Sequence, residues 1–288
     1  LPYDLNSVLN VFKLLLFALK IKGQRIHITG DIHYMAFFLF WKKVAITIHD
    51  CHHYENLKGL KKILFGLIWY RIPIVFSNRV IVISPFVKEQ LQQHFHVKNN
   101  KIIIIPNSFR HIPKVEVSNT CKYFTILVIG TKTNKNLIRL FEAIKGLENI
   151  KLQIIGNLHS KQILAINQYN ISYSNDKNVS QEKLNEFYNS SQMLYYGSTK
   201  EGFGLPILEA QSCGLPVLTS STTSMPYVAG YGSLIVDPYN VDAIRKAILN
   251  IINDENLRIN LIKNGYKNIE RFKLSHFISN YLKTYSSL

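Results

Sequence analysis

Two glutamates, Glu201 and Glu209, are the residues of this sequence whose types and spacing best suit chemistry. Seven residues lie between them, and Gly202 and Gly204 enclose a phenylalanine in a Gly-Phe-Gly turn. Glycine lets a backbone pass close to a ligand and point its N–H groups at it, and Pro206 suits the first helical position because it needs no amide partner. The stretch predicts a helix N-terminus open to an anion, with Glu209 in the first turn, able to accept both hydroxyls of a ribose.

The elements around this stretch place it at one edge of a sheet. Residues 193–196 and 215–219 are short apolar runs typical of buried strands, so the segment forms a strand, loop, helix, strand unit of a parallel sheet. The loop then lies at the carboxyl end of a strand, where open α/β sheets bind ligands. A tight turn with two solvated carboxylates is the alternative, but the ten-residue string from Glu201 to Ala210 is far more specific than a lone Gly-x-Gly.

That string, Glu-Gly-Phe-Gly-Leu-Pro-Ile-Leu-Glu-Ala, resembles the signature of the retaining, two-domain glycosyltransferases of family 4. The resemblance implies an α/β protein of the GT-B fold, with two Rossmann-like domains whose parallel sheets face a central cleft. It implies that the second domain holds most of a nucleotide-diphosphate sugar, which is a co-substrate, and that no cofactor or metal ion is required. The family begins with a strand and a glycine-rich turn, and we expect this chain to lack both.

A second loop has the same arrangement of strand, glycine and helix. Residues 123–129 predict a strand and 137–145 a helix, joined by Gly-Thr-Lys-Thr-Asn-Lys-Asn. Lys132 and Lys135 in such a loop can neutralise the diphosphate that leaves as the glycosidic bond breaks. The loop resembles the phosphate-binding Gly-x-x-x-x-Lys-Asn segment of the family, with Lys135 in the lysine position.

Histidine follows another predicted strand, residues 44–48. The run from His49 to His53 contains five residues with side chains that can bind metals, but neighbours at a strand end point in different directions, so no metal site is predicted. Thr-Ile-His-Asp matches the context in which the family places a histidine against the donor sugar, which implies that role for His49. Capping of the strand is the alternative role.

The resemblance thus implies a complete set of site residues. His49 and Glu201 contact the sugar and Lys135 binds the diphosphate; these three form the predicted catalytic set, with a phosphate oxygen of the leaving group as the base and no protein nucleophile. The predicted donor-binding residues, which surround the phosphates, the sugar and the ribose, are Thr131, Lys132, Gly202, Phe203, Gly204, Leu205 and Glu209.

We expect three parts along the chain. Residues 1–113 form an acceptor-side Rossmann-like domain, 114–271 a donor-nucleotide-binding one, and 272–288 a helix that packs back on the first domain; the aperiodic stretch 110–121 is the expected linker. In the first domain Asp31 is the expected N-cap of a helix over 32–41. An amphipathic helix over 58–70 belongs either to the core or on a membrane surface.

Composition narrows the class of protein and its partners. The chain has 288 residues, 47% of them apolar, and its three cysteines are far apart, so neither a disulfide framework nor a zinc site is expected. The net charge is +16, and +11 of it falls within residues 1–114. A basic first domain suits an anionic membrane surface or a phosphorylated acceptor as a further partner. A scatter of solvated lysines is the default explanation, on equal terms with membrane docking. We find no nucleic-acid-binding motif, so no nucleic acid is expected as a partner. We expect a cytoplasmic protein, either free or bound peripherally to the inner face of the cell membrane.

The sequence therefore predicts a retaining glycosyltransferase that moves a sugar from a UDP- or GDP-linked donor to a glycan or lipid-linked acceptor in envelope polysaccharide synthesis. A truncated or noncatalytic nucleotide-sugar-binding partner is the main alternative, supported by Gln192 and Tyr227 where the family has carboxylates. A glycosidase that uses Glu201 and Glu209 as its acid and base, and a nucleotide-sugar epimerase, are two further alternatives.

Overall fold

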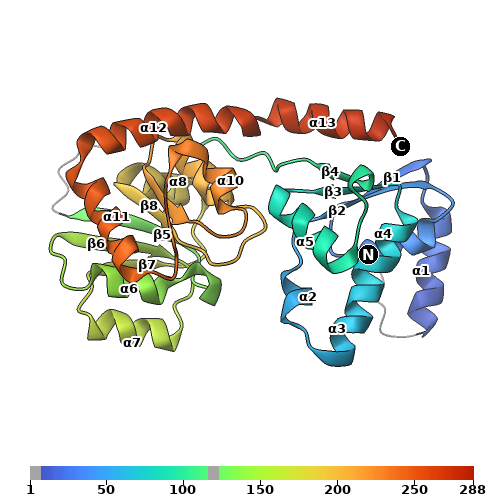
Figure 1. Cartoon of the computed structure of the whole chain (residues 1–288), viewed down its shortest axis with the longest axis horizontal. Helices are drawn as coiled ribbons and strands as arrows, with labels where there is room; N and C mark the ends of the chain where they lie inside the picture. The colour runs from blue at the N-terminus through green and yellow to red at the C-terminus, as the bar shows by residue number, and fades with distance from the viewer. Residues whose placement is uncertain (1–7, 116–122) are drawn as a thin grey trace. The chain divides into compact units, whose positions relative to one another are not determined.

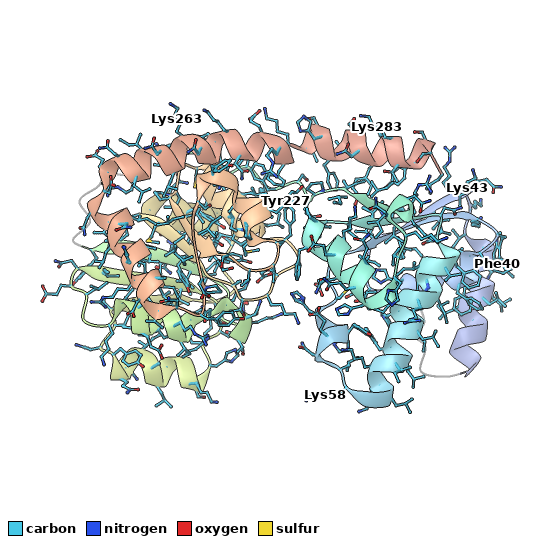
Figure 2. All side chains as sticks on the ribbon, in the orientation of Figure 1. Phe40, Lys43, Lys58, Tyr227, Lys263 and Lys283 are labelled. Carbon is cyan, nitrogen blue, oxygen red and sulfur yellow. The ribbon has the colours of Figure 1, made fainter. Side chains whose placement is uncertain are left out.

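The computed structural model describes residues 8–115 and 123–288. The sequence also predicts a helix over residues 7–20 with Ser7 as its cap; that serine and half of the expected linker, residues 116–121, lie outside the described residues. The chain forms two compact units (Figure 1). The first unit comprises Leu1–Pro106 and Ser275–Leu288, and the second comprises Asn107–Leu274. The domain boundaries expected at 113 and 271 stay predictions. Lysines project into solvent from both units, including Lys43, Lys58, Lys263 and Lys283 (Figure 2).

The first unit is built on a four-stranded parallel sheet. Its strands, in the order β1-β2-β3-β4, are Arg25–Ile28, Lys43–Ile48, Arg79–Val82 and Ile102–Ile104. Burial of β2, from Val44 to Ile48, explains its nearly continuous apolar sequence. The helical segments of this unit are α1 (Val8–Lys20), η1 (His33–Leu39), α2 (His52–Asn56), α3 (Gly59–Phe65), η2 (Gly66–Arg71), α4 (Ile72–Phe76), α5 (Pro85–Phe95), η3 (Asn99–Lys101) and α13 (Leu274–Ser286).

One expected helix of the first unit has a different form. The segment η1 is a 3₁₀ helix, and its N-cap is Ile32, with no side-chain cap, so the prediction of Asp31 as N-cap of a helix over 32–41 is wrong. Six of its seven residues are buried. Packing within the first unit, rather than a side-chain cap, therefore stabilises this segment.

The second unit contains a six-stranded parallel sheet in the order β10-β9-β8-β5-β6-β7. Counted along the chain from β5, this is the 3-2-1-4-5-6 order of a Rossmann fold, and its strand order reverses between β5 and β8. The strands are β5 (Phe124–Ile129), β6 (Ile150–Ile155), β7 (Tyr173–Asp176), β8 (Met193–Tyr196), β9 (Val217–Ser220) and β10 (Leu234–Val236). Two parallel α/β sheets confirm the expected fold class.

The helical segments of the second unit alternate with these strands, as expected of parallel connections. They are η4 (Thr133–Lys135), α6 (Leu137–Ile144), α7 (Ser160–Gln168), α8 (Gln181–Ser190), α9 (Leu205–Ser212), α10 (Met225–Ala229), η5 (Gly230–Gly232), α11 (Val241–Asn253), α12 (Glu255–Ile269) and η6 (Glu270–Phe272). The sequence patterns did not predict the short α10 and β10. The sequence also predicts Ser180 as the N-cap of a helix over 181–188, and this cap is confirmed because the Ser180 hydroxyl accepts from the Lys183 amide at 3.2 Å.

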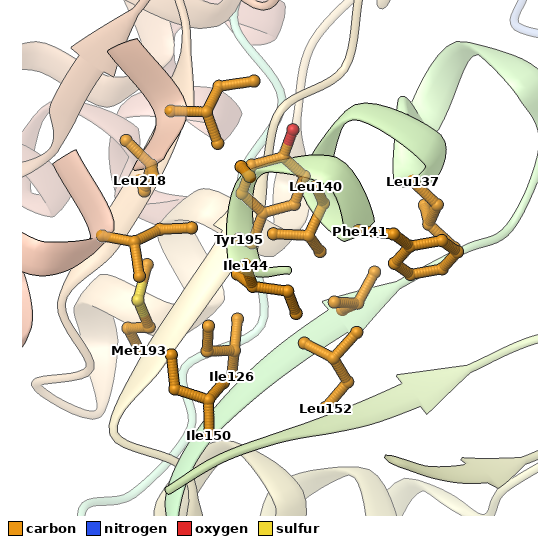
Figure 3. Close-up of a cluster of buried hydrophobic side chains, with 14 of the residues drawn as sticks. Ile126, Leu137, Leu140, Phe141, Ile144, Ile150, Leu152, Met193, Tyr195 and Leu218 are labelled. Carbon is orange, nitrogen blue, oxygen red and sulfur yellow. The ribbon is translucent and has the colours of Figure 1, made fainter. Parts of the chain in front are cut away.

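The core of the second unit joins the two strands at the reversal point. Ile126 of β5 and Met193 of β8 pack with Leu140 and Phe141 of α6, and all four side chains are fully buried (Figure 3). Burying each such side chain contributes about 1.5–3 kcal/mol. This packing fixes β5 and β8 side by side, and with them the loops at their carboxyl ends.

The carboxyl-terminal helix α13 belongs with the first unit. Its Tyr285 hydroxyl lies 2.7 Å from Nδ1 of His27 on β1, and Nε2 of the same ring lies 2.7 Å from the Thr47 hydroxyl on β2. Phe277 and Tyr281 pack on the buried cluster that includes Ala45. The carboxyl-terminal helix thus shares a hydrophobic core with β2 and β3.

Candidate functional site

The two loops singled out by the sequence meet at the reversal point of the second sheet. One follows β5 and runs from Gly130 to Asn136; the other follows β8 and runs from residue 197 to 204. The Thr199 amide donates to the Asn134 carbonyl at 2.8 Å, and the Asn134 side-chain amide donates to the Lys200 carbonyl at 2.9 Å. These bonds hold the loops against each other at the edge where open α/β sheets bind ligands.

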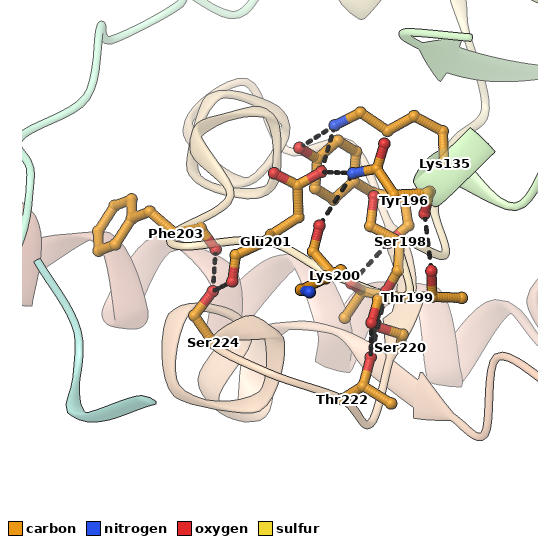
Figure 4. A network of polar contacts seen from close by, with 12 residues as sticks. Lys135, Tyr196, Ser198, Thr199, Lys200, Glu201, Phe203, Ser220, Thr222 and Ser224 are labelled. Atoms are coloured by element: carbon orange, nitrogen blue, oxygen red, sulfur yellow. Dashed lines mark hydrogen bonds and ion pairs between the residues drawn. The ribbon is translucent and has the colours of Figure 1, made fainter. Parts of the chain in front are cut away.

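Lys135 and Glu201 form the charged centre of this site. Nζ of Lys135 lies 2.6 Å from Oε1 of Glu201 and 2.6 Å from the Tyr196 hydroxyl, and it stands 4.3 Å from the centre of the Tyr196 ring (Figure 4). The Asn134 amide donates to the same Glu201 oxygen at 3.0 Å. The two charged side chains are only 16% and 19% exposed, so their positions are well fixed.

Tyr196 completes the surroundings of the lysine. Burial, and then the nearby Glu201 carboxylate, raise the pKa of Tyr196 well above its usual value, so its hydroxyl stays protonated. Lys135 donates to this hydroxyl and to Glu201, and an ammonium group has three N–H donors. The third donor suits an anionic ligand.

Hydroxyl groups and glycines shape the loop after β8. The Ser224 hydroxyl lies 3.0 Å from the Glu201 carbonyl and 2.7 Å from that of Phe203, which ties the loop down to the segment before α10 (Figure 4). Gly204, the N-cap residue of α9, has φ of +128°, and a Cβ there would lie 2.8 Å from Cε of Met225. Glycine is therefore required where the loop enters the helix.

Glu209 lies farther along α9 than the sequence predicted. The helix begins at Leu205 and has no acidic residue in its first turn, so the prediction that Glu209 lies in the first turn is wrong, and Pro206 takes the second helical position rather than the first. The helix begins one residue earlier than expected, because Gly204 has the unusual backbone conformation at the N-cap. Glu209 remains partly buried, with 17% of its side chain exposed.

Two residues that the sequence did not single out hold the Glu209 carboxylate. The Tyr188 hydroxyl donates to Oε2 at 2.7 Å, and Nε of Arg110 lies 3.9 Å from Oε1. Burial, and then the Glu209 charge, raise the pKa of Tyr188 well above its usual value. Arg110, which fell in the expected linker, also donates to Asn185 of α8 at 2.6 Å. No local pattern could have found these contacts, because they join segments far apart in sequence.

The remaining donor-site candidates of the second unit have different surroundings. Thr131 is buried, and its hydroxyl donates to the Asn157 carbonyl at 2.6 Å, while Lys132 is exposed. The Phe203 ring is buried and meets Phe272 edge-on at 5.8 Å, which makes the ring a structural anchor. Leu205 is 38% exposed at the start of α9. The roles of these residues in donor binding stay predictions.

His49 belongs to the first unit. It follows β2, is exposed, and its Nε2 lies 3.0 Å from the Thr29 carbonyl, so the structure brings it together with the end of β1. The proposed contact with a donor sugar stays a prediction. The neighbouring Asp50 accepts from the His52 amide at 2.8 Å and forms a turn. Within residues 8–115 and 123–288, no group of three His, Cys, Asp or Glu side chains is arranged to hold a metal ion.

The two departures from the family pattern both have structural partners. Gln192 precedes β8, at the opposite strand end from the candidate site, and its Oε1 accepts from the Thr125 amide of β5 at 2.7 Å. Tyr227 lies under the Arg271 guanidinium, 5.0 Å from it, and beside Phe272. Gln192 therefore does not touch the paired charges of Lys135 and Glu201.

The fold and the site define an α/β protein whose second unit presents a helix N-terminus and a pair of opposite charges at a topological switch point. The family profile described as glycosyl transferases group 1 matches residues 108–268, and the profile of glycosyltransferase family 4 matches residues 5–110. The chain belongs to this glycosyltransferase family.

Curated relatives support the same family. O-antigen chain mannosyltransferase B of Escherichia coli is 38% identical over 110 residues, which cover 38% of this chain and 29% of that protein. The capsular polysaccharide biosynthesis glycosyltransferase CapM of Staphylococcus aureus is 27% identical over 84% of this chain and 69% of its own length. The chain thus spans less than a third of the first relative and about two thirds of the second.

Solved structures show the same fold. A glycosyltransferase from Rickettsia africae ESF-5 superposes with a TM-score of 0.84 at 16% identity, covering 99% of this chain and 83% of that one. HepE of Anabaena, in complex with UDP and glucose, gives a TM-score of 0.82 at 15% identity over 96% of this chain and 81% of its own. The GT-B fold expected from the resemblance is confirmed.

Proposed function

We propose that the protein is a retaining, metal-independent glycosyltransferase that transfers a sugar from a UDP- or GDP-linked donor to a hydroxyl of a glycan or lipid-linked acceptor. The observation that carries this proposal is the meeting of Lys135, Glu201 and the N-terminus of α9 at the switch point of the second sheet. A lysine and a helix N-terminus together suit a diphosphate, which must leave as the glycosidic bond breaks. The nucleotide-diphosphate sugar is the co-substrate, and no cofactor takes part.

Each residue has a distinct task in this proposal. Lys135 uses its third N–H to bind the diphosphate, and Lys132 and Thr131 act from the same loop. The amides from Gly202 to Leu205 contact the phosphate and the sugar. Glu201 accepts from sugar hydroxyls while Lys135 and Asn134 hold its other oxygen in place.

The ribose and the reacting sugar complete the assignment. Glu209, oriented by Tyr188, accepts hydrogen bonds from the ribose hydroxyls. His49 contacts the sugar from the first unit. The acceptor hydroxyl attacks from the side that the diphosphate leaves, and a phosphate oxygen takes its proton, which retains the configuration without a protein nucleophile.

The relatives favour envelope polysaccharides as the setting. The names of two of them specify O-antigen chains and capsular polysaccharide. A lipid-linked acceptor would bring the protein to the inner face of the cell membrane as a cytoplasmic, peripheral enzyme. No helix within the described residues has the length and apolar character needed to cross a membrane.

The test supplies the purified chain with UDP- or GDP-linked sugars labelled in the sugar, together with a lipid extract that contains glycan acceptors. We expect label in the extract, one nucleoside diphosphate released for each sugar transferred, an unchanged anomeric configuration by NMR, and full activity in EDTA. Nucleotide-independent hydrolysis of glycosides would show a glycosidase, and an altered sugar nucleotide without acceptor would show an epimerase. Donor binding without turnover would indicate a noncatalytic protein.

A further inference from the structure

A continuous helical segment of the first unit carries its aliphatic side chains on the outside. The segment runs from α3 through the π-helical η2 into α4. Leu60, Ile63, Leu64 and Leu67 recur at i, i+3, i+4 and i+7, which is the spacing of one helix face. They are 69%, 67%, 47% and 42% exposed, and we call these four residues the α3 stripe. Such a face normally packs on a core; here it meets solvent.

A different face anchors this segment to the first unit. Phe65 stacks on Trp69 at 4.9 Å, and Tyr70 stacks on Phe95 of α5 at 4.6 Å. The Trp69 ring N–H donates to the Asp31 carbonyl at 3.0 Å. Gly66 is buried and lies so close to Tyr54 that a Cβ there would stand 2.7 Å from the ring. The segment is therefore held in place mainly by side chains outside the α3 stripe.

The charged residues on the segment that carries the α3 stripe have one sign. Lys58 and Lys61 are exposed beside it, and Figure 2 shows Lys58 at the outer end of the segment. Residues 56–88 contain six lysines and arginines and no aspartate or glutamate. An exposed apolar face flanked by lysines matches the boundary of an anionic lipid layer, where the acyl chains lie next to negative headgroups.

We propose that the α3 stripe docks the first unit on an anionic phospholipid surface. The stripe lies at the boundary of headgroups and acyl chains, and Lys58 and Lys61 contact the headgroup phosphates. A second copy of the chain is the other candidate occupant. A two-fold symmetric contact would bring Lys58 and Lys61 of one copy close to the same lysines of the other. Each copy has a net charge of +16, so electrostatic repulsion disfavours this contact. The proposal goes beyond the proposed transfer reaction and does not depend on it, because its test measures binding to vesicles alone.

The second unit offers a closely matched control. Ile163 and Leu164 of α7 are 41% and 67% exposed, the same residue types as Ile63 and Leu64 at 67% and 47%. The experiment measures partition of the purified chain onto vesicles of phosphatidylcholine with 30% phosphatidylglycerol, and onto phosphatidylcholine alone. We expect binding to the anionic vesicles, weakened about tenfold or more by Ile63→Ser with Leu64→Ser, and unchanged by Ile163→Ser with Leu164→Ser.

Charge variants provide a second arm that leaves the apolar face intact. Lys58→Gln and Lys61→Gln should each weaken binding about fivefold at low salt, since a lysine near an anionic surface contributes about 1 kcal/mol. Lys161→Gln on α7 is the control. The proposal is overturned if the wild-type chain does not bind anionic vesicles, or if the stripe variants and their controls lose binding equally. A dimer in solution that the stripe variants dissociate, with vesicle binding unaffected, also overturns it.

Discussion

The ion pair between Lys135 and Glu201 provides the most quantitative prediction. In Lys135→Met the Glu201 carboxylate keeps the Asn134 amide at 3.0 Å but loses the ammonium at 2.6 Å. Breaking a fully buried pair costs about 3–5 kcal/mol, and breaking an exposed pair costs about 0–1 kcal/mol. Because these side chains are 16% and 19% exposed, we expect a loss of about 2 kcal/mol. That corresponds to a melting temperature lower by about 4–8 °C for a unit of this size.

A double-mutant cycle isolates the pair itself. Glu201→Gln should cost about 1 kcal/mol, because the amide oxygen still accepts from Lys135 and Asn134. The double variant Lys135→Met, Glu201→Gln should lose less unfolding free energy than the two single variants lose together, by at least about 1 kcal/mol. The reason is that the double variant leaves no charge unpaired. Differential scanning calorimetry measures the three variants. Tryptophan fluorescence is the internal control, because Trp41 and Trp69, the two tryptophans of the chain, both lie in the first unit.

One outcome of the double-mutant cycle would contradict the proposed ion pair. If the costs of Lys135→Met and Glu201→Gln simply add, the two side chains do not interact in solution, and the charged centre of the site is misassigned. If Lys135→Met is as stable as the wild-type protein and binds nucleotide equally well, the lysine has neither the structural nor the binding role.

Three further predictions concern other parts of the chain. Tyr188→Phe removes the hydroxyl 2.7 Å from Glu209 and should weaken nucleoside diphosphate binding about tenfold in titration calorimetry; unchanged affinity would contradict the ribose assignment. Burial, and then the nearby His49, lower the pKa of His27, so the unfolded chain binds a proton more readily than the folded protein. The free energy of unfolding of the first unit should therefore fall as the pH drops below about 6.5. His27→Gln should flatten this pH dependence in fluorescence-monitored urea titrations. Gly204→Ala, at φ of +128° and 2.8 Å from Met225, should destabilise the protein by about 1–3 kcal/mol in calorimetry, and a neutral result would refute the strain.

Much of the fold follows from patterns that are local in the sequence. The strand over 193–196 has the expected bounds because it is a compact apolar run between turn residues. The 3₁₀ form of η1 could not be predicted, since no residue type or spacing in this apolar run distinguishes a 3₁₀ helix from an α-helix. The sequence also could not predict that the apolar face of α3 is exposed, because the same i, i+3, i+4, i+7 spacing fits a face buried in the core or a face on the surface.

The candidate site also contains residues that the sequence predicted and residues that it could not predict. Spacing within each loop identified Lys135 and Glu201, and the sheet order then brought the two loops together. Tyr188 and Arg110 were missed because their contacts with Glu209 depend on how α8 and the segment after Asn107 pack against α9. A single sequence records residue spacing along a strand or helix, but not which distant side chain approaches a carboxylate.

The most direct test of the central claim measures the melting temperature of the purified chain with UDP, GDP and ADP, beside Lys135→Ala and Glu209→Ala. The account predicts that one nucleoside diphosphate stabilises the wild-type protein, by about 2.7 kcal/mol at a concentration one hundred times its dissociation constant. Both variants should lose most of that stabilisation. If none of the three nucleotides stabilises a folded sample, or if both variants respond like the wild-type protein, the donor site does not lie at Lys135 and Glu209.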